Sequence, residues 1–267
     1  MPLLLFFLAV QISPRVVKQG DTMHVVASAN VISARLNGRV IRLFLQQDGK
    51  ALGLMPIPID TKPGKYQVDF LDSAGVIKET GPVTVTNGRF ASQNIVLSHE
   101  LTELKPAPNE TEDSEAFRAL VSPTRYWDEP LELPINGCMT SPYGARRLHN
   151  RKPTGASHMG IDQRGAEGAP IHAVAGGVVR LVRPWSLHGN TVGIDHGQGF
   201  ESMYLHMSKF ATTEGAVVKK GDVIGYVGST GRSTAPHLHW SLYANGVAVS
   251  PAQWVKLSPC AKRKKRR

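Results

Sequence analysis

Short runs of alternating hydrophobic and polar residues dominate the first third of the chain. Between residues 12 and 88 these runs are separated by Gly, Asn, Asp or Pro at close intervals. Alternation with a period of two is the pattern of a strand that buries one face. Short, evenly spaced strands are typical of a β-sandwich. We therefore expect a small sandwich over residues 12–88, with strands near 16–17, 23–27, 40–45, 52–59, 66–71 and 83–86.

One local feature refines this expectation. The sequence Pro-Gly-Lys-Tyr-Gln-Val at residues 63–68 resembles the entry to a late strand of immunoglobulin-like domains. We therefore expect an immunoglobulin-like β-sandwich. No cluster of His, Cys or carboxylate side chains occurs in this part of the sequence, so we expect the chemistry to lie elsewhere.

The pattern changes between residues 89 and 130. A Pro-rich breaker precedes Asn109, a favourable N-cap residue, and acidic residues then occupy the first turn, where the helix dipole favours them. Three apolar residues at helical spacing follow and form one apolar stripe. We predict a helix over 110–121 within a linker that spans residues 89–130.

Residues 131–258 return to strands and turns. We expect strands near 177–183, 191–195, 200–207, 223–227 and 236–243, and no long helix. The fold class is therefore mainly β, and the chemistry of this half has to be built on a sheet.

The chain begins with an apolar stretch at residues 3–10 that resembles the core of a secretion signal. It is far shorter than the ~20 residues of a membrane span. No Lys or Arg precedes it and no clear cleavage site follows, and a first β-strand is the alternative interpretation. We expect residues 1–11 to be the remnant of a leader, the protein to be exported to the periplasm or the cell exterior, and no transmembrane span.

Positive charge is concentrated in the second half of the chain. The net charge is +10; residues 1–130 carry 13 Lys/Arg and 14 Asp/Glu, whereas residues 131–267 carry 18 and 7. A surplus of this kind suits an anionic polymer. Six of the basic residues form the run 262–267, which has no interleaved aromatic residues and follows no recognition-helix pattern. We expect a solvated basic tail or weak tether at 259–267 and no specific nucleic-acid binding.

Cys138 and Cys260 are the only cysteines. A disulfide between them is possible in an oxidising compartment, and two free buried thiols are an equal alternative. Structural zinc sites usually draw on closely spaced Cys pairs, so these two isolated residues argue against a zinc finger.

The residues that carry the strongest chemical signal lie in the second half. They are four histidines and one carboxylate: His158, Asp162, His206, His237 and His239. A catalytic zinc takes three protein ligands of His or carboxylate type and keeps a fourth position open for water. Five candidates for three places leave two residues to act on that water, which favours a catalytic site over a closed structural one.

Strand alternation orders these residues on a sheet. Residues two apart in a strand share a face, so His237 and His239 would stand side by side on a polar face. The same rule applied to residues 201–208 would place Tyr204 and His206 on one face.

From about residue 134 to 251 the chain resembles the lysostaphin-type zinc endopeptidases of bacterial cell walls, peptidase family M23. The matching motifs, in chain order, are Ser141-Pro142-Tyr143-Gly144-Ala145-Arg146, His158-x-x-x-Asp162, Gly189-Asn190-x-Val192 with Asp195-His196-Gly197, Tyr204-x-His206, Gly228-Ser229-Thr230-Gly231 and His237-x-His239. The last motif alone is a weak signal, but three histidine motifs in this order and at these separations are specific. The resemblance implies an antiparallel β-sheet peptidase domain, which we place at 131–258.

The resemblance also implies roles for the five residues. His158, Asp162 and His239 would bind one Zn²⁺, while His206 and His237 would stay off the metal and serve catalysis. Zinc lowers the pKa of its water and polarises a carbonyl, and imidazoles can move the proton and bind the developing oxyanion. The sequence leaves open which imidazole is the general base.

Two residues within the motifs, Tyr204 and Asn190, each have two interpretations, and a third residue, Ala235, departs from the family pattern. Tyr204 could bind substrate or simply pack, and Asn190 could face the cleft or only form a turn. Ala235 stands where family members commonly have glycine, which we expect to affect the substrate fit and not the metal. We expect structural or surface roles for the other histidines, His24, His99, His149, His172, His188 and His196.

The resemblance thus implies an endopeptidase that hydrolyses peptide bonds of peptidoglycan, in a cross-bridge or a stem peptide. The alternative is a non-catalytic peptidoglycan-binding module, or a regulator of another wall hydrolase, on the same scaffold. Such relatives have typically lost metal ligands, whereas here none is missing. The oligomeric state and the bond that is cut stay open.

Overall fold

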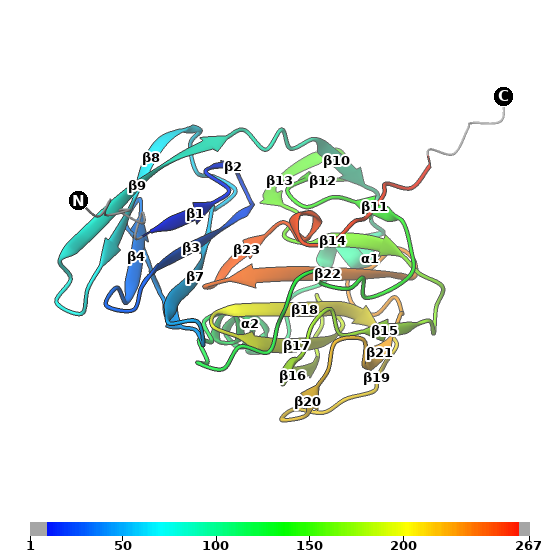
Figure 1. Ribbon diagram of the computed structural model, residues 1–267. Coiled ribbons are helices and arrows are strands. Elements are labelled where there is room, and N and C mark those ends of the chain that lie inside the picture. The colour runs from blue at the N-terminus through cyan, green and yellow to red at the C-terminus, as the bar shows by residue number, and fades with distance from the viewer. Residues whose placement is uncertain (1–9, 262–267) are drawn as a thin grey trace, which may run out of the picture. The chain divides into compact units, whose positions relative to one another are not determined.

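The structure, a computed structural model, describes residues 10–261. It divides into two compact units, Met1–Gly88 and Arg89–Arg267. Both units are mainly β (Figure 1). Most of the expected leader at 1–11, and the run 262–267 of the expected basic tail, lie outside the described residues.

The first unit is built from two sheets. One sheet has the strand order β1-β3-β7-β6 and the other has the order β2-β9-β8-β4-β5. Their strands are β1 (Gln11–Ser13), β2 (Val16–Lys18), β3 (Thr22–Ser28), β4 (Ser33–Leu36), β5 (Arg39–Arg42), β6 (Phe44–Leu45), β7 (Lys50–Pro56), β8 (Gly64–Leu71) and β9 (Ile77–Thr86).

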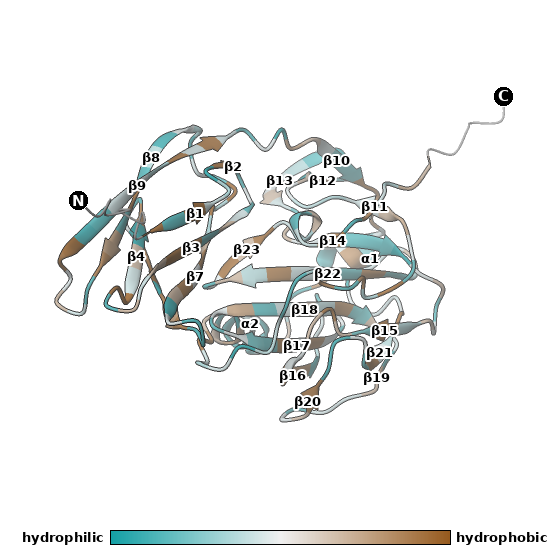
Figure 2. Ribbon diagram, in the orientation of Figure 1, coloured by the Kyte–Doolittle hydropathy of each residue, from teal (hydrophilic) through white to brown (hydrophobic). Residues whose placement is uncertain are grey.

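A single hydrophobic core joins these two sheets. Met23 and Val25 of β3 belong to it together with Val68 and Phe70 of β8, and all four are fully buried. In Figure 2 hydrophobic and hydrophilic bands alternate along the strands, as burial of one face per sheet requires. The two sheets that share a core form a β-sandwich, and its immunoglobulin-like topology stays a prediction.

The second unit is organised around an eight-stranded sheet in the order β11-β14-β22-β18-β17-β16-β20, with β23 paired to β22. In Figure 1 its central strands lie side by side. Their bounds are β11 (Met139–Ser141), β14 (Ile161–Arg164), β16 (Gly177–Pro184), β17 (Asn190–Gly197), β18 (Phe200–Met207), β20 (Val217–Val218), β22 (His237–Ala244) and β23 (Val247–Val249).

Two three-stranded sheets complete this unit. Their orders are β10-β12-β13 and β15-β21-β19. Their strands are β10 (Ser92–Ile95), β12 (Arg146–His149), β13 (Lys152–Ser157), β15 (Pro170–His172), β19 (Lys209–Phe210) and β21 (Val223–Tyr226). Over 131–258 the described helical structure is one short 3-10 turn, Pro251–Gln253, in agreement with the expected lack of a long helix.

Residues 89–130 are an integral part of the second unit, whereas the sequence suggested a linker. Strand β10 from this segment pairs in parallel with β12. The segment also contains two helices, α1 (His99–Glu103) and α2 (Glu110–Arg118), the second of which ends before the predicted residue 121. Phe117 of α2 packs in a core cluster with Leu181 and Met203 of the large sheet. The apolar stripe expected on this helix therefore packs against the large sheet.

A disulfide joins Cys138 and Cys260, across a sequence separation of 122. This resolves the two alternatives left by the sequence in favour of the bridge. The backbone supports the same junction, because Met139 N donates to Ser258 O and Cys260 N donates to Met139 O. The bridge thus joins the chain just before β11, the first strand of the large sheet in sequence, to the chain that follows β23, its last strand.

None of the helices within the described part of the chain is both long and apolar enough to cross a membrane.

A buried acid lies inside the large sheet. Glu201 of β18 is fully buried, and within residues 10–261 neither of its carboxylate oxygens has a hydrogen-bond partner. Burial, together with the charge of Asp195 opposite it in the register, raises the pKa of Glu201 well above its ordinary value. The side chain is therefore accommodated as the neutral acid.

The linkage of this pKa to folding gives a prediction. The folded-state pKa is raised, so the contribution of Glu201 to stability is fully present below its unfolded pKa of about 4.3 and is lost as pH rises toward the folded value. Glu201→Gln, which mimics the neutral acid, should gain stability relative to wild type by up to about 1.4 kcal/mol for each pH unit above that point. Thermal unfolding followed by Trp fluorescence from pH 5 to 8 tests this.

The four Trp residues all lie beyond residue 88, so this signal reports on the second unit alone. In the control variant Glu167→Gln, at an exposed position, the difference in stability from wild type should not grow with pH. A Glu201→Gln curve parallel to wild type across this pH range contradicts the prediction.

The disulfide gives a second prediction. Closing a loop of this length restricts the unfolded chain, so the double variant Cys138→Ser/Cys260→Ser should lose about 2–5 kcal/mol of unfolding free energy. Denaturant unfolding by Trp fluorescence, with and without reductant, measures the loss. Reductant should shift the wild-type midpoint to that of the variant and leave the variant unchanged; equal midpoints for all four samples contradict a stabilising bridge.

Candidate active site

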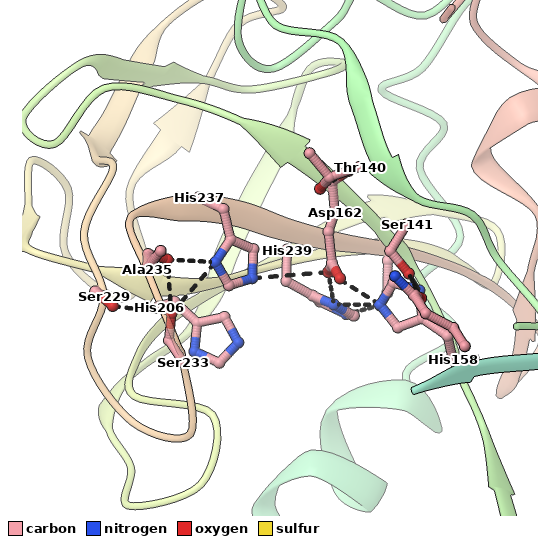
Figure 3. Close-up of polar contacts among 12 residues, drawn as sticks. Thr140, Ser141, His158, Asp162, His206, Ser229, Ser233, Ala235, His237 and His239 are labelled. Carbon is pink, nitrogen blue, oxygen red and sulfur yellow. Dashed lines mark hydrogen bonds and ion pairs between the residues drawn. The ribbon is translucent and has the colours of Figure 1, made fainter. Parts of the chain in front are cut away.

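The pairing of β14 with β22 brings the site together. These antiparallel strands place Asp162 opposite His239 and Arg164 opposite His237. On β22 the side chains of Leu238, Trp240 and Leu242 are fully buried, while those of His237, His239, Ser241 and Tyr243 line a cleft on the other face. The predicted alternation of β22 is confirmed, and it turns both histidines toward the carboxylate (Figure 3).

Three ligand-type atoms converge at this point. Asp162 Oδ1 lies 3.0 Å from His158 Nε2 and 2.9 Å from His239 Nδ1, and the two nitrogens are 2.9 Å apart. His158 and His239 carry their rings at a centroid distance of 4.7 Å. These three residues form the one cluster among the described residues whose atoms could hold a metal ion together.

The hydrogen bonds around the cluster test whether a cation fits. His158 Nδ1 lies 3.0 Å from Pro142 O, which can only accept, so this nitrogen carries the ring proton and Nε2 presents a lone pair. His239 Nε2 lies 3.0 Å from the Ser241 hydroxyl, which leaves Nδ1 for the cluster. The lone pair of His158 Nε2, the ring nitrogen Nδ1 of His239 and a carboxylate oxygen then face one another, an arrangement that a shared cation stabilises. The residues therefore fit a divalent metal, and outer hydrogen bonds of this kind are typical of metal-binding histidines.

Arg147 secures the other oxygen of the carboxylate. Its Nη2 donates to Asp162 Oδ2 at 3.2 Å and its Nη1 donates to Gln93 Oε1 at 2.6 Å. Burial raises the pKa of Asp162, but the contacts with His158 and His239 outweigh it and hold that pKa well below its usual range. Asp162 is therefore ionised, with Oδ1 turned to the histidines and Oδ2 held by the guanidinium.

A bulge in β18 places His206 in the cleft. Asn190 pairs with Met207 and Val192 pairs with Tyr204, so Leu205 and His206 together face the single residue Thr191. His206 has a φ of 62°, in the left-handed region that side chains other than glycine rarely adopt. This conformation breaks the alternation and turns His206 to the face of Leu205, where its ring lies 5.0 Å from that of His237.

The bulge corrects the prediction for Tyr204. Alternation placed Tyr204 and His206 on one face, but Tyr204 points into the core and is fully buried. Its hydroxyl accepts from Val174 N and from Ser202 Oγ, each at 2.9 Å. Burial raises the pKa of Tyr204 above its ordinary value. Tyr204 therefore packs and does not contact substrate, the second of the two interpretations.

Asn190 also lies outside the cleft. Its side-chain amide donates to Met207 O at 3.0 Å and to Ser208 O at 3.4 Å, and its backbone N–H donates to Thr230 Oγ1 at 2.9 Å. Of the two interpretations left open by the sequence, the structure thus favours a structural role, since these bonds hold the chain just after the bulge at His206.

His206 and His237 share one hydrogen-bond arrangement. His206 Nδ1 donates to Thr230 O at 2.8 Å, and His237 Nδ1 donates to Ala235 O, also at 2.8 Å. Each ring therefore directs Nε2 away from the backbone, and that of His237 lies 3.8 Å from Asp162 Oδ1. Burial lowers the pKa of His206 to about 3, so the ring is neutral at neutral pH. Ala235 contributes its carbonyl here, which any residue could supply.

The cleft that contains the five predicted residues has a volume of about 960 Å³. Its walls come from β10, the β12–β13 hairpin, the 187–188 loop and the 232–236 loop. All of these lie within the second unit. The structure thus brings His158, Asp162, His206, His237 and His239 into one cleft.

Residues 156–251 match the family model described as peptidase family M23. The second unit contains a peptidase M23 domain.

Curated relatives agree with this assignment. The M23 domain segment is 44% identical over 113 residues to the DD-carboxypeptidase/endopeptidase Mpg of Neisseria meningitidis, an alignment that covers 42% of this chain and 26% of that protein. It is 38% identical over 102 residues to lysostaphin of Staphylococcus simulans, covering 37% of this chain and 20% of lysostaphin. The matched segment therefore spans about a quarter or less of these relatives.

A solved structure extends the likeness beyond the M23 domain. A crystal structure named as an M23 peptidase from Pseudomonas aeruginosa superposes with a TM-score of 0.66 at 28% identity, covering 86% of this chain and 92% of that one. The fold of most of the chain, and not only of the M23 domain, is therefore one seen among M23 peptidases.

Sequence reasoning missed a buried carboxylate that supports the M23 cleft. Glu110, at the start of α2, is 1% exposed and accepts from the backbone N–H groups of Ala107, Ser186, Leu187 and His188, and from His188 Nδ1 at 2.5 Å. Burial raises its pKa, but these bonds reverse the effect and lower it. The adjacent Asn109 occupies the N-cap position but makes no side-chain cap bond.

Glu110 is linked to His206 through the loop it binds. His188 lines the cleft, and its carbonyl accepts from His206 N at 3.0 Å. The signal available in the sequence was only an acidic first turn, which dipole arguments explain without any contact to the site. Glu110 is thus a positioning residue for the loop that supports the bulge.

This arrangement predicts a specific effect of Glu110→Gln. The carboxylate now accepts hydrogen bonds from backbone N–H groups, and the NH₂ of Gln would face those donors with a donor of its own. The variant should therefore lose about 1–3 kcal/mol of unfolding free energy. Amide hydrogen exchange should become faster at residues 186–188. Denaturant unfolding and exchange measured by mass spectrometry test both effects.

Glu112→Gln is the matched control, because Glu112 is an exposed residue in the same first turn. It should change stability by no more than about 0.5 kcal/mol. Equal effects of the two variants would mean that Glu110 acts only through the helix dipole.

Proposed function

We propose that this protein is a zinc-dependent endopeptidase that hydrolyses peptide bonds in bacterial peptidoglycan. The observation that carries the proposal is the convergence of His158, Asp162 and His239 beside two further histidines that are not needed as ligands. The names of Mpg and lysostaphin support the reaction class and the cell-wall substrate.

His158 Nε2, Asp162 Oδ1 and His239 Nδ1 would hold one Zn²⁺. Two nitrogens and one carboxylate oxygen are the ligand types that zinc takes in hydrolytic sites. When bound, zinc would lower the pKa of its water and polarise the scissile carbonyl. Arg147 holds the other oxygen of Asp162 and so orients the carboxylate for this role.

His206 and His237 would supply the proton transfers. Each is anchored through Nδ1 to a backbone carbonyl, so its orientation is fixed before substrate binds. A neutral Nε2 can take a proton from the attacking water, and the resulting N–H can donate it to the leaving amine or stabilise the oxyanion. The bulge at His206 is needed because regular alternation would turn this ring into the core.

We also propose that the protein acts outside the cytoplasm, since its substrate would be the wall. The apolar stretch at residues 3–10 and the Cys138–Cys260 bridge support this location. Fractionation of the native organism, followed by detection of the protein in each fraction, tests it.

Digestion of purified walls tests the activity. The metal-loaded protein should release new amine ends, and a chelator should abolish release until zinc is restored. His158→Ala should lose both the metal and activity. His206→Ala and His237→Ala should keep stoichiometric zinc and lose about 100-fold or more in rate.

His99→Ala, at an exposed residue that does not line the cleft, is the control and should behave as wild type. Release that is indifferent to chelator would exclude the metal mechanism. Zinc-loaded protein that binds walls but releases no amine would instead support a non-catalytic binding module.

A further inference from the structure

The cleft is positively charged beyond what its chemistry needs. Among the described residues that line it are three arginines, Arg147, Arg164 and Arg232, and a single carboxylate, Asp162. Asp162 is already engaged by Arg147 and by the histidines. The other two guanidinium groups therefore have positive charge that a ligand carboxylate can neutralise.

We infer that Arg164 and Arg232 bind a free carboxylate of the substrate, so that the cleft selects an anionic stem peptide over an uncharged glycine bridge. This inference rests on the proposed function and names the substrate class for the same site.

The three arginines differ in whether their hydrogen bonds are already used. Arg147 donates to both Gln93 and Asp162, and its side chain is 11% exposed. Arg164 and Arg232 are exposed, and neither forms an ion pair with a carboxylate within residues 10–261. Arg147 is therefore a structural part of the site, while the other two are available to a ligand.

Strand register fixes the position of Arg164. It lies two residues after Asp162 on β14 and directly opposite His237 on β22. Residues two apart on a strand share a face and lie ~6.6 Å apart. Arg164 therefore continues the row of functional residues past the proposed metal ligands. Its distance from Asp162 corresponds to about two residues of an extended substrate peptide.

Arg232 approaches the cleft from the loop that precedes β22. Its backbone N–H donates to Leu187 O at 2.9 Å, and Thr230, two residues earlier, accepts from His206. Its charge also contributes, after burial, to the lowered pKa of His149 in the hairpin that lines the cleft. Arg232 is therefore held at the cleft rim by the same loop that anchors the catalytic histidines.

The chemistry of the two substrate classes differs in one respect that these residues can detect. Stem peptides and their direct cross-links carry free carboxylates next to the scissile bonds, whereas an oligoglycine bridge carries none. A guanidinium binds a carboxylate in a bidentate, charge-assisted manner. Such a contact near the reacting bond favours the charged substrate.

The test uses the full-length, zinc-loaded protein and three defined substrates. Two are identical cross-linked stem-peptide dimers, one with free carboxylates and one with every carboxylate amidated; the third is pentaglycine. Wild type should cleave the free-acid dimer with a kcat/KM at least about 10-fold above that for the amidated dimer. Arg164→Gln and Arg232→Gln should each lower kcat/KM for the free-acid dimer about 10-fold or more, mainly through KM, and leave the amidated dimer nearly unchanged.

Arg146→Gln is the matched control. Arg146 neighbours Arg147 on β12 but does not line the cleft, so its loss removes the same charge without touching substrate. It should leave all three rates unchanged. An equal loss caused by Arg146→Gln would mean that net charge alone attracts the substrate and would overturn the inference.

Two outcomes separate this inference from the proposed function. If wild type cleaves the amidated and free-acid dimers equally, or prefers pentaglycine, the inference fails while the endopeptidase activity stands. If wild type cleaves none of the three substrates, the proposed function itself fails. A parallel loss on both dimers in the arginine variants would show that these residues shape the cleft without binding a carboxylate, which also overturns the inference.

Discussion

The second unit depends on one electrostatic constraint, which is that three electron-rich atoms face each other across two paired strands. Asp162 Oδ1, His158 Nε2 and His239 Nδ1 all lie within 3.0 Å of one another. Such a group is unfavourable unless a cation is shared among them, so the surrounding protein has to hold it in place. Strand register, the guanidinium of Arg147 and the carbonyl of Pro142 perform this task.

The same principle extends to His206 and His237, the two histidines outside this cluster. Each is tied through Nδ1 to a backbone carbonyl, and these carbonyls belong to one loop, which joins β21 to β22. That loop also donates or accepts bonds with the 187–190 segment, and Glu110 in turn binds residues 186–188. A continuous series of polar contacts therefore fixes the position of His206. It begins at Glu110 in α2, more than ninety residues earlier in the sequence.

Much of this organisation could be predicted from the sequence, because strand periodicity is a local property. Alternation predicted the burial of Leu238 and Trp240 and the joint exposure of His237 and His239 to the cleft. It failed at Tyr204, because one extra residue in a bulge reverses which face of the strand the following side chains occupy. Nothing in the amino-acid composition of the strand indicates such a bulge. Residues 89–130 were taken for a linker for a similar reason: the burial of Glu110 and Phe117 depends on partners more than sixty residues away.

The resemblance to M23 peptidases located the five candidate site residues, the four histidines and Asp162. It could not reveal the residues that hold these five in position. Arg147 and Glu110 act by contacts with Asp162 and with a loop, and an arginine or a glutamate in a polar segment has many ordinary explanations. Contacts of this kind become visible only once the chain is folded.

The Cys138–Cys260 bridge has a mechanical consequence. All five candidate site residues lie between these two cysteines in the sequence, so the bond makes them part of a closed covalent ring. A pulling force applied to the chain outside the ring would pass from one side to the other through the two sulfur atoms. The backbone between the two cysteines, which includes the strands that carry His237 and His239, would not be stretched by that force.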